Sequence, residues 1–107
     1  MEVTYDDTPY GAIRCPSCQG VFLHHTRVKV YWRATENAEH GLEIQSDSQA
    51  VQVTTDMTDN PSRSRDGLEI HFWCETCHAR PRLTLIQNKG STQLQWVSRP
   101  EPPADSG

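Results

Sequence analysis

The chain has 107 residues, a formal net charge of −4 and a mean hydropathy of −0.72, with 35% hydrophobic residues. This length suits one domain, and the small hydrophobic fraction predicts a modest core that gains from a crosslink between distant segments. No apolar run is long enough to span a membrane, and the opening residues Met1–Asp7 lack the basic and apolar segments of a secretion signal. We therefore expect a soluble cytoplasmic protein without membrane contacts.

The first half of the chain predicts strands and turns, with no convincing helix. Gly20–Arg33 alternates loosely between β-branched or aromatic residues and polar ones, which predicts one long strand or a hairpin bent near residues 24–25. Residues 34–41 are too few and too polar to anchor a helix. Residues 42–44 and 51–53 have apolar side chains with period two, and we expect a second pair of strands there.

The second half begins with a polar connection, Asp56–Gly67, which contains the turn dipeptides Asn-Pro and Asp-Gly and is expected to be solvated. Leu68–Trp73 follows as the clearest strand of the chain. Its odd-numbered position 71 is a histidine between the apolar residues Ile70 and Phe72, so the alternation predicts that His71 faces solvent.

A hairpin is predicted next, because alternating strands at residues 83–85 and 94–96 flank Asn88-Lys89-Gly90, where glycine tolerates a positive φ. Residues 99–107 are rich in proline and poor in apolar side chains, and we expect a flexible tail. The domain prediction is therefore a single β domain over residues 1–98 with the tail at 99–107.

All four cysteines fall in two C-x-x-C pairs, Cys15 with Cys18 and Cys74 with Cys77. Such a turn holds two thiolates close enough to share one ion, and two turns supply the four sulfurs of a tetrahedral site, for which zinc is the commonest metal. The pairs are 55 residues apart, so the metal would close a long loop. Iron in the same four sulfurs and two disulfides in a secreted protein are the alternatives.

At these two knuckles, the tight turns Cys15-Pro16-Ser17-Cys18 and Cys74-Glu75-Thr76-Cys77, the chain resembles the zinc ribbon family. The resemblance implies a β-rich fold in which both knuckles grip one structural zinc ion, here an all-β zinc ribbon with an elaborating β-insertion between the knuckles. Size and layout are similar to those of small bacterial and phage zinc-ribbon proteins. Many ribbons have glycine directly after the second cysteine, where this chain has Gln19 and His78, but histidine also tolerates left-handed backbone.

The sequence does not indicate an enzyme. Four thiolates fill the coordination sphere and leave no position for an activated water, and no nucleophile, base and oxyanion donor are seen together. His24 and His25 are adjacent and would point to opposite faces of a strand, so they cannot bind one ion together. His78 is an alternative metal ligand that the four thiolates make unnecessary.

Charge is segregated along the chain, and this suggests two functions. Residues 8–35 and 78–100 contain basic side chains and no acid, whereas residues 36–77 carry nine acids against two arginines. We predict a non-enzymatic adaptor that contacts a protein of a nucleic-acid machine or a defence complex. Direct DNA or RNA binding by the basic segments is the alternative, which the net acidity disfavours. The residues predicted to contact a partner are Arg63, Arg65, Arg80, Arg82 and Lys89. The residues on which bases could stack are Trp32, Trp73 and Trp96.

Overall fold

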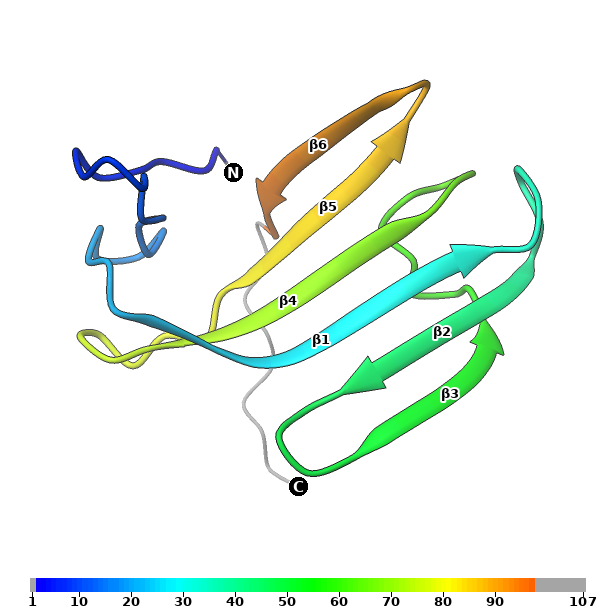
Figure 1. Ribbon diagram of the computed structural model, residues 1–107, viewed down its shortest axis with the longest axis horizontal. Helices are drawn as coiled ribbons and strands as arrows, with labels where there is room; N and C mark the ends of the chain where they lie inside the picture. Colours follow the sequence, from blue (N-terminus) through cyan, green and yellow to red (C-terminus); the bar gives the residue numbers. More distant parts are fainter. Residues whose placement is uncertain (1, 98–107) are drawn as a thin grey trace.

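The computed structural model describes residues 2–97, and within that range it contains six β-strands and no helix, hence no helix able to cross a membrane. The strands are β1 Leu23–Arg33, β2 His40–Ser46, β3 Val51–Asp56, β4 Gly67–Cys74, β5 Arg82–Asn88 and β6 Ser91–Trp96. They form one antiparallel sheet in the order β3-β2-β1-β4-β5-β6 (Figure 1). The all-β prediction is confirmed. The expected tail at 99–107 lies outside the described residues.

Each strand that the alternation predicts is present at the expected place. The segment leading to Arg33 is one strand rather than a hairpin, and its bend is a β-bulge between His25 and Arg27. The predicted turn after β5 is also present, and Lys89 and Gly90 both have positive φ, at 51° and 85°. Two successive left-handed residues are what a tight two-residue hairpin needs to match the twist of its strands.

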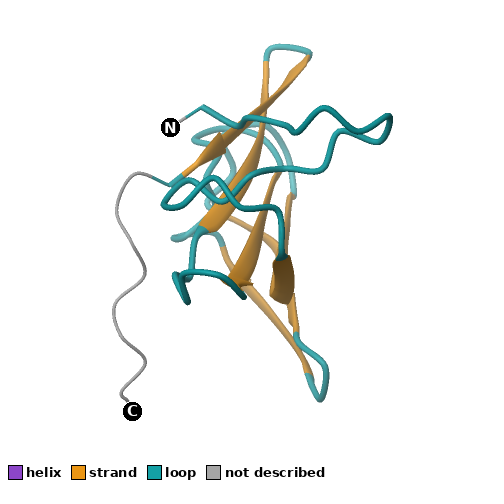
Figure 2. Ribbon diagram, turned by 90° about the vertical axis from the view of Figure 1, so that its left-hand side faces the viewer, coloured by secondary structure: helices purple, strands orange, loops and turns teal. Residues whose placement is uncertain are grey.

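The two strands that carry the knuckles are neighbours at the centre of the sheet. β1 leaves the first knuckle and pairs with β4, which runs into the second, from Leu23 opposite Cys74 to Tyr31 opposite Gly67. The insertion between the knuckles adds β2 and β3 beyond β1 and so widens the same sheet. Viewed from the side, the strands make one layer with loops at its ends (Figure 2). We call the end with the cysteines the knuckle end and the opposite end the distal end.

One face of the sheet is polar, yet it contains most of the buried strand residues. Glu69 and His71 of β4 are only 8% and 6% exposed, and they join through a contact of 2.7 Å between His71 Nε2 and Glu69 Oε1. Arg82 of β5 lies 4.0 Å from the same carboxylate. The prediction that His71 faces solvent is therefore wrong. Alternation gave its face correctly, but that face is the covered one.

The connection from β3 to β4, residues 57–66, is what covers this polar face at the distal end. Met57 and Ser62 are buried, and Ser62 Oγ donates to the backbone oxygen of Gln87 on β5 at 3.0 Å. Arg33 at the end of β1 holds the connection in place, because its side chain donates to the backbone oxygens of Arg65 at 3.1 Å and Ser62 at 2.7 Å. The segment expected to be solvated is thus partly a second layer.

Candidate metal centre

The first knuckle is a tight turn closed by backbone hydrogen bonds. The N–H of Gln19 donates to the carbonyl of Cys15 at 2.8 Å, and the N–H of Cys15 donates to the carbonyl of Gly20 at 2.7 Å. Two further N–H groups point at sulfur, from Ser17 to Cys15 Sγ and from Gly20 to Cys18 Sγ, each at 3.4 Å. Donors of this kind stabilise thiolates rather than thiols.

The second knuckle repeats the same turn at the end of β4. The N–H of His78 donates to the carbonyl of Cys74 at 2.8 Å, and the N–H of Cys74 donates to the carbonyl of Ala79 at 2.9 Å. The residue that follows the second cysteine has a positive φ in both turns, 65° at Gln19 and 64° at His78. The expectation that histidine tolerates this conformation is confirmed at His78, and Gln19 adopts the same conformation.

The four sulfurs converge at the knuckle end. Cys15 Sγ lies 3.7 Å from Cys77 Sγ, Cys18 Sγ lies 3.6 Å from Cys74 Sγ, and all four lie within 4.8 Å of one another. A disulfide would bring two sulfurs to about 2.0 Å. A tetrahedral ion bound at about 2.3 Å would place its sulfurs about 3.8 Å apart, which matches these distances. The four cysteines can therefore hold one metal ion in a zinc-ribbon-like site.

The thiols of Cys74 and Cys77 differ in acidity. For Cys74, burial raises the pKa, but the N–H groups of Cys77 and Thr76 and the nearby sulfurs lower it to about 7. For Cys77, the N–H of Ala79 lowers the pKa, yet burial and the other sulfurs together raise it to about 12. Several thiolates side by side repel one another, and a dication removes that repulsion by binding all of them.

Hydrogen bonds to backbone oxygens hold the two knuckles in place independently of a metal ion. The N–H of Glu75, inside the second knuckle, donates to the carbonyl of Phe22 at 3.0 Å, just before β1 begins. Arg14 Nη1 donates to the carbonyl of Gln19 at 3.0 Å and so braces the first turn from its N-terminal side. The sequence offered no signal for either contact, because both join residues through a backbone oxygen that any residue type supplies.

The two histidines near the site, His24 and His78, lie against the ring of Trp73 and do not join the sulfurs. His78 lies parallel to Trp73, with 5.7 Å between ring centroids and 12° between planes, and His24 lies 5.8 Å from the same ring. His24 Nε2 also contacts Glu75 Oε1 at 3.0 Å. Among the described residues, only the four cysteines form a group of three or more converging potential metal ligands. His78 is not one of that group.

The predicted contact residues lie at both ends of the sheet and do not form one cluster. Arg63 and Lys89 are exposed at the distal end, and Arg80 is exposed beyond the second knuckle. Arg65 lies 3.3 Å from Glu36 through Nη2, and Arg82 is half-buried beside the Glu69 carboxylate.

The three tryptophans differ in exposure. Trp32 is 53% exposed, Trp73 is half-buried beside His24 and His78, and Trp96 is 2% exposed and packs edge-on against Phe72 at 5.7 Å. A stacking role for Trp96 is therefore wrong, since no base can reach its ring.

Comparisons of the chain with protein-family models, curated proteins and solved structures find no match. The site is thus interpreted from its geometry alone.

Proposed function

We propose that this protein is a non-enzymatic zinc-binding interaction module. The observation that carries the proposal is the set of four sulfurs at tetrahedral spacing. Because four thiolates occupy every position of a tetrahedral ion, none is left for the water that a catalytic zinc activates. The metal then acts by joining residues 2–20 to the β4 and β5 hairpin, which is a structural role.

In this proposal the module contacts a protein of a nucleic-acid machine or a defence complex. The side chains available for such a contact are Arg63 and Lys89 at the distal end and Arg80 at the knuckle end, all exposed. Arg65 and Arg82 offer less, because each already lies beside a carboxylate of this chain. Direct nucleic-acid binding receives less support, since the formal net charge of −4 opposes a phosphate backbone.

The metal part is tested by elemental mass spectrometry of protein purified without added metal. We expect about one zinc per chain, as a single tetrathiolate site requires. Iron in that stoichiometry would change the identity of the metal but keep its structural role. Two disulfides without metal would overturn the proposal.

The contact is tested by affinity capture from cells of the source organism, followed by direct binding to the purified candidate partner. Two variants separate the ends of the sheet: Arg63→Ala with Lys89→Ala at the distal end, and Arg80→Ala at the knuckle end. Each is the control for the other, and neither should shift the melting temperature, because exposed charges contribute little to stability. Loss of binding in one variant locates the contact. A salt-dependent gel shift with generic single- or double-stranded nucleic acid would instead favour direct nucleic-acid binding.

A further inference from the structure

The face of the sheet opposite the buried Glu69 and His71 is almost entirely apolar. Two rows of side chains run across this face. Within each row, every residue lies directly opposite its neighbour on the adjacent strand. The central row crosses all six strands and consists of Val53, Ile44, Val30, Leu68, Leu85 and Leu94. The second row consists of Val51, Ser46, Val28, Ile70, Leu83 and Trp96. Serine is the one polar residue in these two rows, which we call the apolar face, and no charged side chain belongs to it.

Much of the apolar face is open to solvent. Val51 is 67% exposed, Val53 is 58% exposed and Leu94 is 41% exposed, and Trp32 and Leu42 extend the exposed area at the distal end. Leu68 and Leu85, at its centre, are half-buried, whereas Leu83 and Trp96 of β5 and β6 are buried. Soluble monomers rarely expose contiguous apolar patches of more than a few hundred square ångströms. A β-sheet with one apolar face is normally one of two packed layers.

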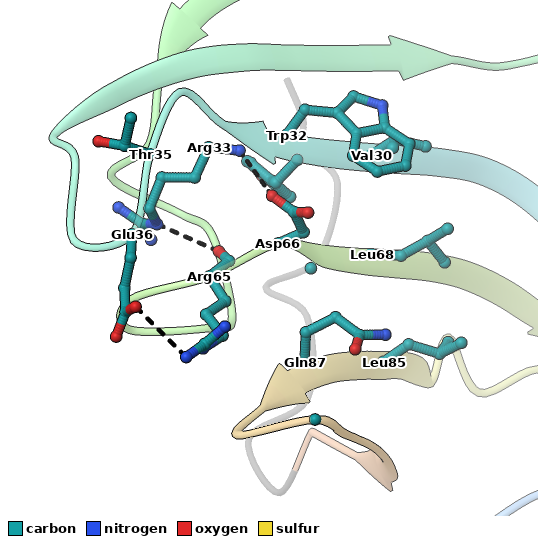
Figure 3. A pocket seen from close by; sticks show the side chains of 13 residues that line it. Val30, Trp32, Arg33, Thr35, Glu36, Arg65, Asp66, Leu68, Leu85 and Gln87 are labelled. Atoms are coloured by element: carbon teal, nitrogen blue, oxygen red, sulfur yellow. Dashed lines mark hydrogen bonds and ion pairs between the residues drawn. The ribbon is translucent and has the colours of Figure 1, made fainter.

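A hollow of about 450 Å³ marks the distal part of this face. Figure 3 shows Val30 and Trp32 from β1, Leu68 from β4 and Leu85 from β5 on the same side of the sheet. The charged residues at its margin are engaged with one another or with backbone, as the ion pair between Arg65 and Glu36 illustrates. The hollow therefore has apolar side chains at its base, and the charges at its margin are paired. Such a site suits a neutral, apolar surface rather than an ion.

We propose that two copies of this chain pack their apolar faces together and form a two-layered β-sandwich dimer. Residues 2–97, the part of the chain that the structure describes, leave Val51, Val53 and Leu94 of this face exposed. The connection between β3 and β4, residues 57–66, lies on the polar side, where Asn60 and Pro61 cover Gly67 and Ser62 is buried. The remaining residues, 1 and 98–107, include a single large apolar side chain, that of Met1.

The area of the face is sufficient for a dimer. Six strands about 4.8 Å apart, each about six residues long at about 3.3 Å per residue, give one face of the sheet a projected area of about 570 Å² per copy, or about 1,140 Å² for two copies. Side chains that project from the sheet make its accessible surface larger than this projected area. The surface that two copies would bury therefore reaches that of a standard specific interface, about 1,200–2,000 Å². Area alone does not set affinity, and we expect a dissociation constant in the micromolar range or below.

A second copy also matches the face in chemistry and shape. A surface without charges excludes a charged partner such as nucleic acid from this site, because its phosphates would find no cation there. Two identical sheets have the same right-handed twist, and such sheets pack face to face at about −30° with interdigitated side chains. An isologous contact of this kind closes after two copies and does not propagate.

The test is sedimentation equilibrium of the full zinc-loaded chain across a range of concentrations up to about 100 μM, where a micromolar dimer is populated. We expect a mass of twice the 12.2 kDa of one chain. Val53→Lys with Leu94→Lys introduces charge at two exposed positions of the apolar face and should weaken dimerisation by about 100-fold or more, because a lysine is costly to bury without a partner. The matched control is Thr54→Lys with Gln93→Lys, which adds the same charge to the same strands on the other face and should leave the dimer intact.

Zinc content and near-ultraviolet circular dichroism, measured on every variant, show separately whether the fold and the metal site are retained. A second measurement, acrylamide quenching of tryptophan fluorescence, needs no charged variant. The contribution of Trp32 is the difference between wild type and Trp32→Phe. We expect this contribution to be quenched weakly in the dimer and more strongly after dilution to the monomer. A monomeric wild type, a dimer that survives both lysines on the apolar face, or equal losses in the two lysine variants would each overturn the proposal. None of these outcomes bears on zinc stoichiometry, which tests the proposed function independently.

Discussion

Gln19 and His78 occupy equivalent positions in two turns that are distant in sequence. Each follows the second cysteine of its pair, each has a φ near 65°, and each donates its N–H to the carbonyl of the first cysteine at 2.8 Å. A left-handed residue at this point reverses the chain so that the next N–H can reach sulfur, as the N–H of Gly20 does. Neither residue is glycine, so both turns are held in a costly conformation by the contacts around them.

The first prediction follows from that cost. Gln19→Gly should raise the free energy of unfolding of the zinc-loaded protein by about 1 kcal/mol, since glycine adopts a positive φ without a steric penalty. His78→Gly should give less, because it also removes the ring that stacks on Trp73. Chemical denaturation of both variants measures the difference. A larger gain at His78, or a loss at Gln19, would contradict it.

The second prediction concerns the ligands. Cys74→Ser should lower zinc below one per chain and cost several kcal/mol of stability, since structural zinc supplies on the order of 10 kcal/mol of apparent binding free energy. Thr76→Ser, in the same turn but at an exposed position, is the matched control and should keep both metal and stability. His71→Ala is unsuitable as a neutral control, because His71 is buried against Glu69. Full zinc content in Cys74→Ser would show that this sulfur is not a ligand.

The third prediction is a pH dependence that arises from Glu69. Burial raises the pKa of this carboxyl, but the hydrogen bond and charge of His71, followed by the charges of Arg82 and Lys29, lower it below its ordinary value of 4.5. A carboxyl whose pKa is lower in the folded state contributes stability that is present above the unfolded pKa and is lost as the pH falls through the folded one.

The measurement is the difference in unfolding free energy between wild type and Glu69→Gln at a series of pH values. We expect the wild type to be favoured at neutral pH and the difference to shrink below a pH of about 4.5. Because both proteins contain the same cysteines, acid release of the metal affects them alike and cancels in the difference. A difference that grows as the pH falls would mean that the pKa of Glu69 is raised by folding.

The fourth prediction separates two glycines. A Cβ at Gly41 would lie 2.0 Å from the backbone oxygen of Trp32 and 2.8 Å from Arg33 Cα, so Gly41→Ala must push β1 and β2 apart. We expect a loss of about 3 kcal/mol, the upper part of the range for overpacking. Gly90→Ala meets no atom within 4 Å but has a φ of +85°, and it should cost only about 1 kcal/mol. Thermal unfolding of the two variants provides the comparison, and equal losses would contradict the close approach at Gly41.

The four cysteines and the six strands could be found from the sequence because both are encoded locally. A C-x-x-C pair specifies a turn within four residues, and alternation with period two specifies a strand within about six. The hairpin around Lys89 and Gly90 is as local, since its turn type depends on two residues. Convergence of the two knuckles also followed from the sequence, but only through chemistry, because one tetrahedral ion needs both pairs.

Which face of the sheet is covered was decided by the tertiary structure. Alternation separates Glu69 and His71 from Leu68 and Ile70 and says nothing of what lies above either set. The path of residues 57–66 lies over the polar side, where the acid and the imidazole are buried, while much of the apolar face is exposed. That path depends on side-chain contacts from Arg33 to Ser62 and Arg65, some 30 residues away along the chain. Periodicity within a strand cannot carry this information, because burial is a property of what packs on the strand.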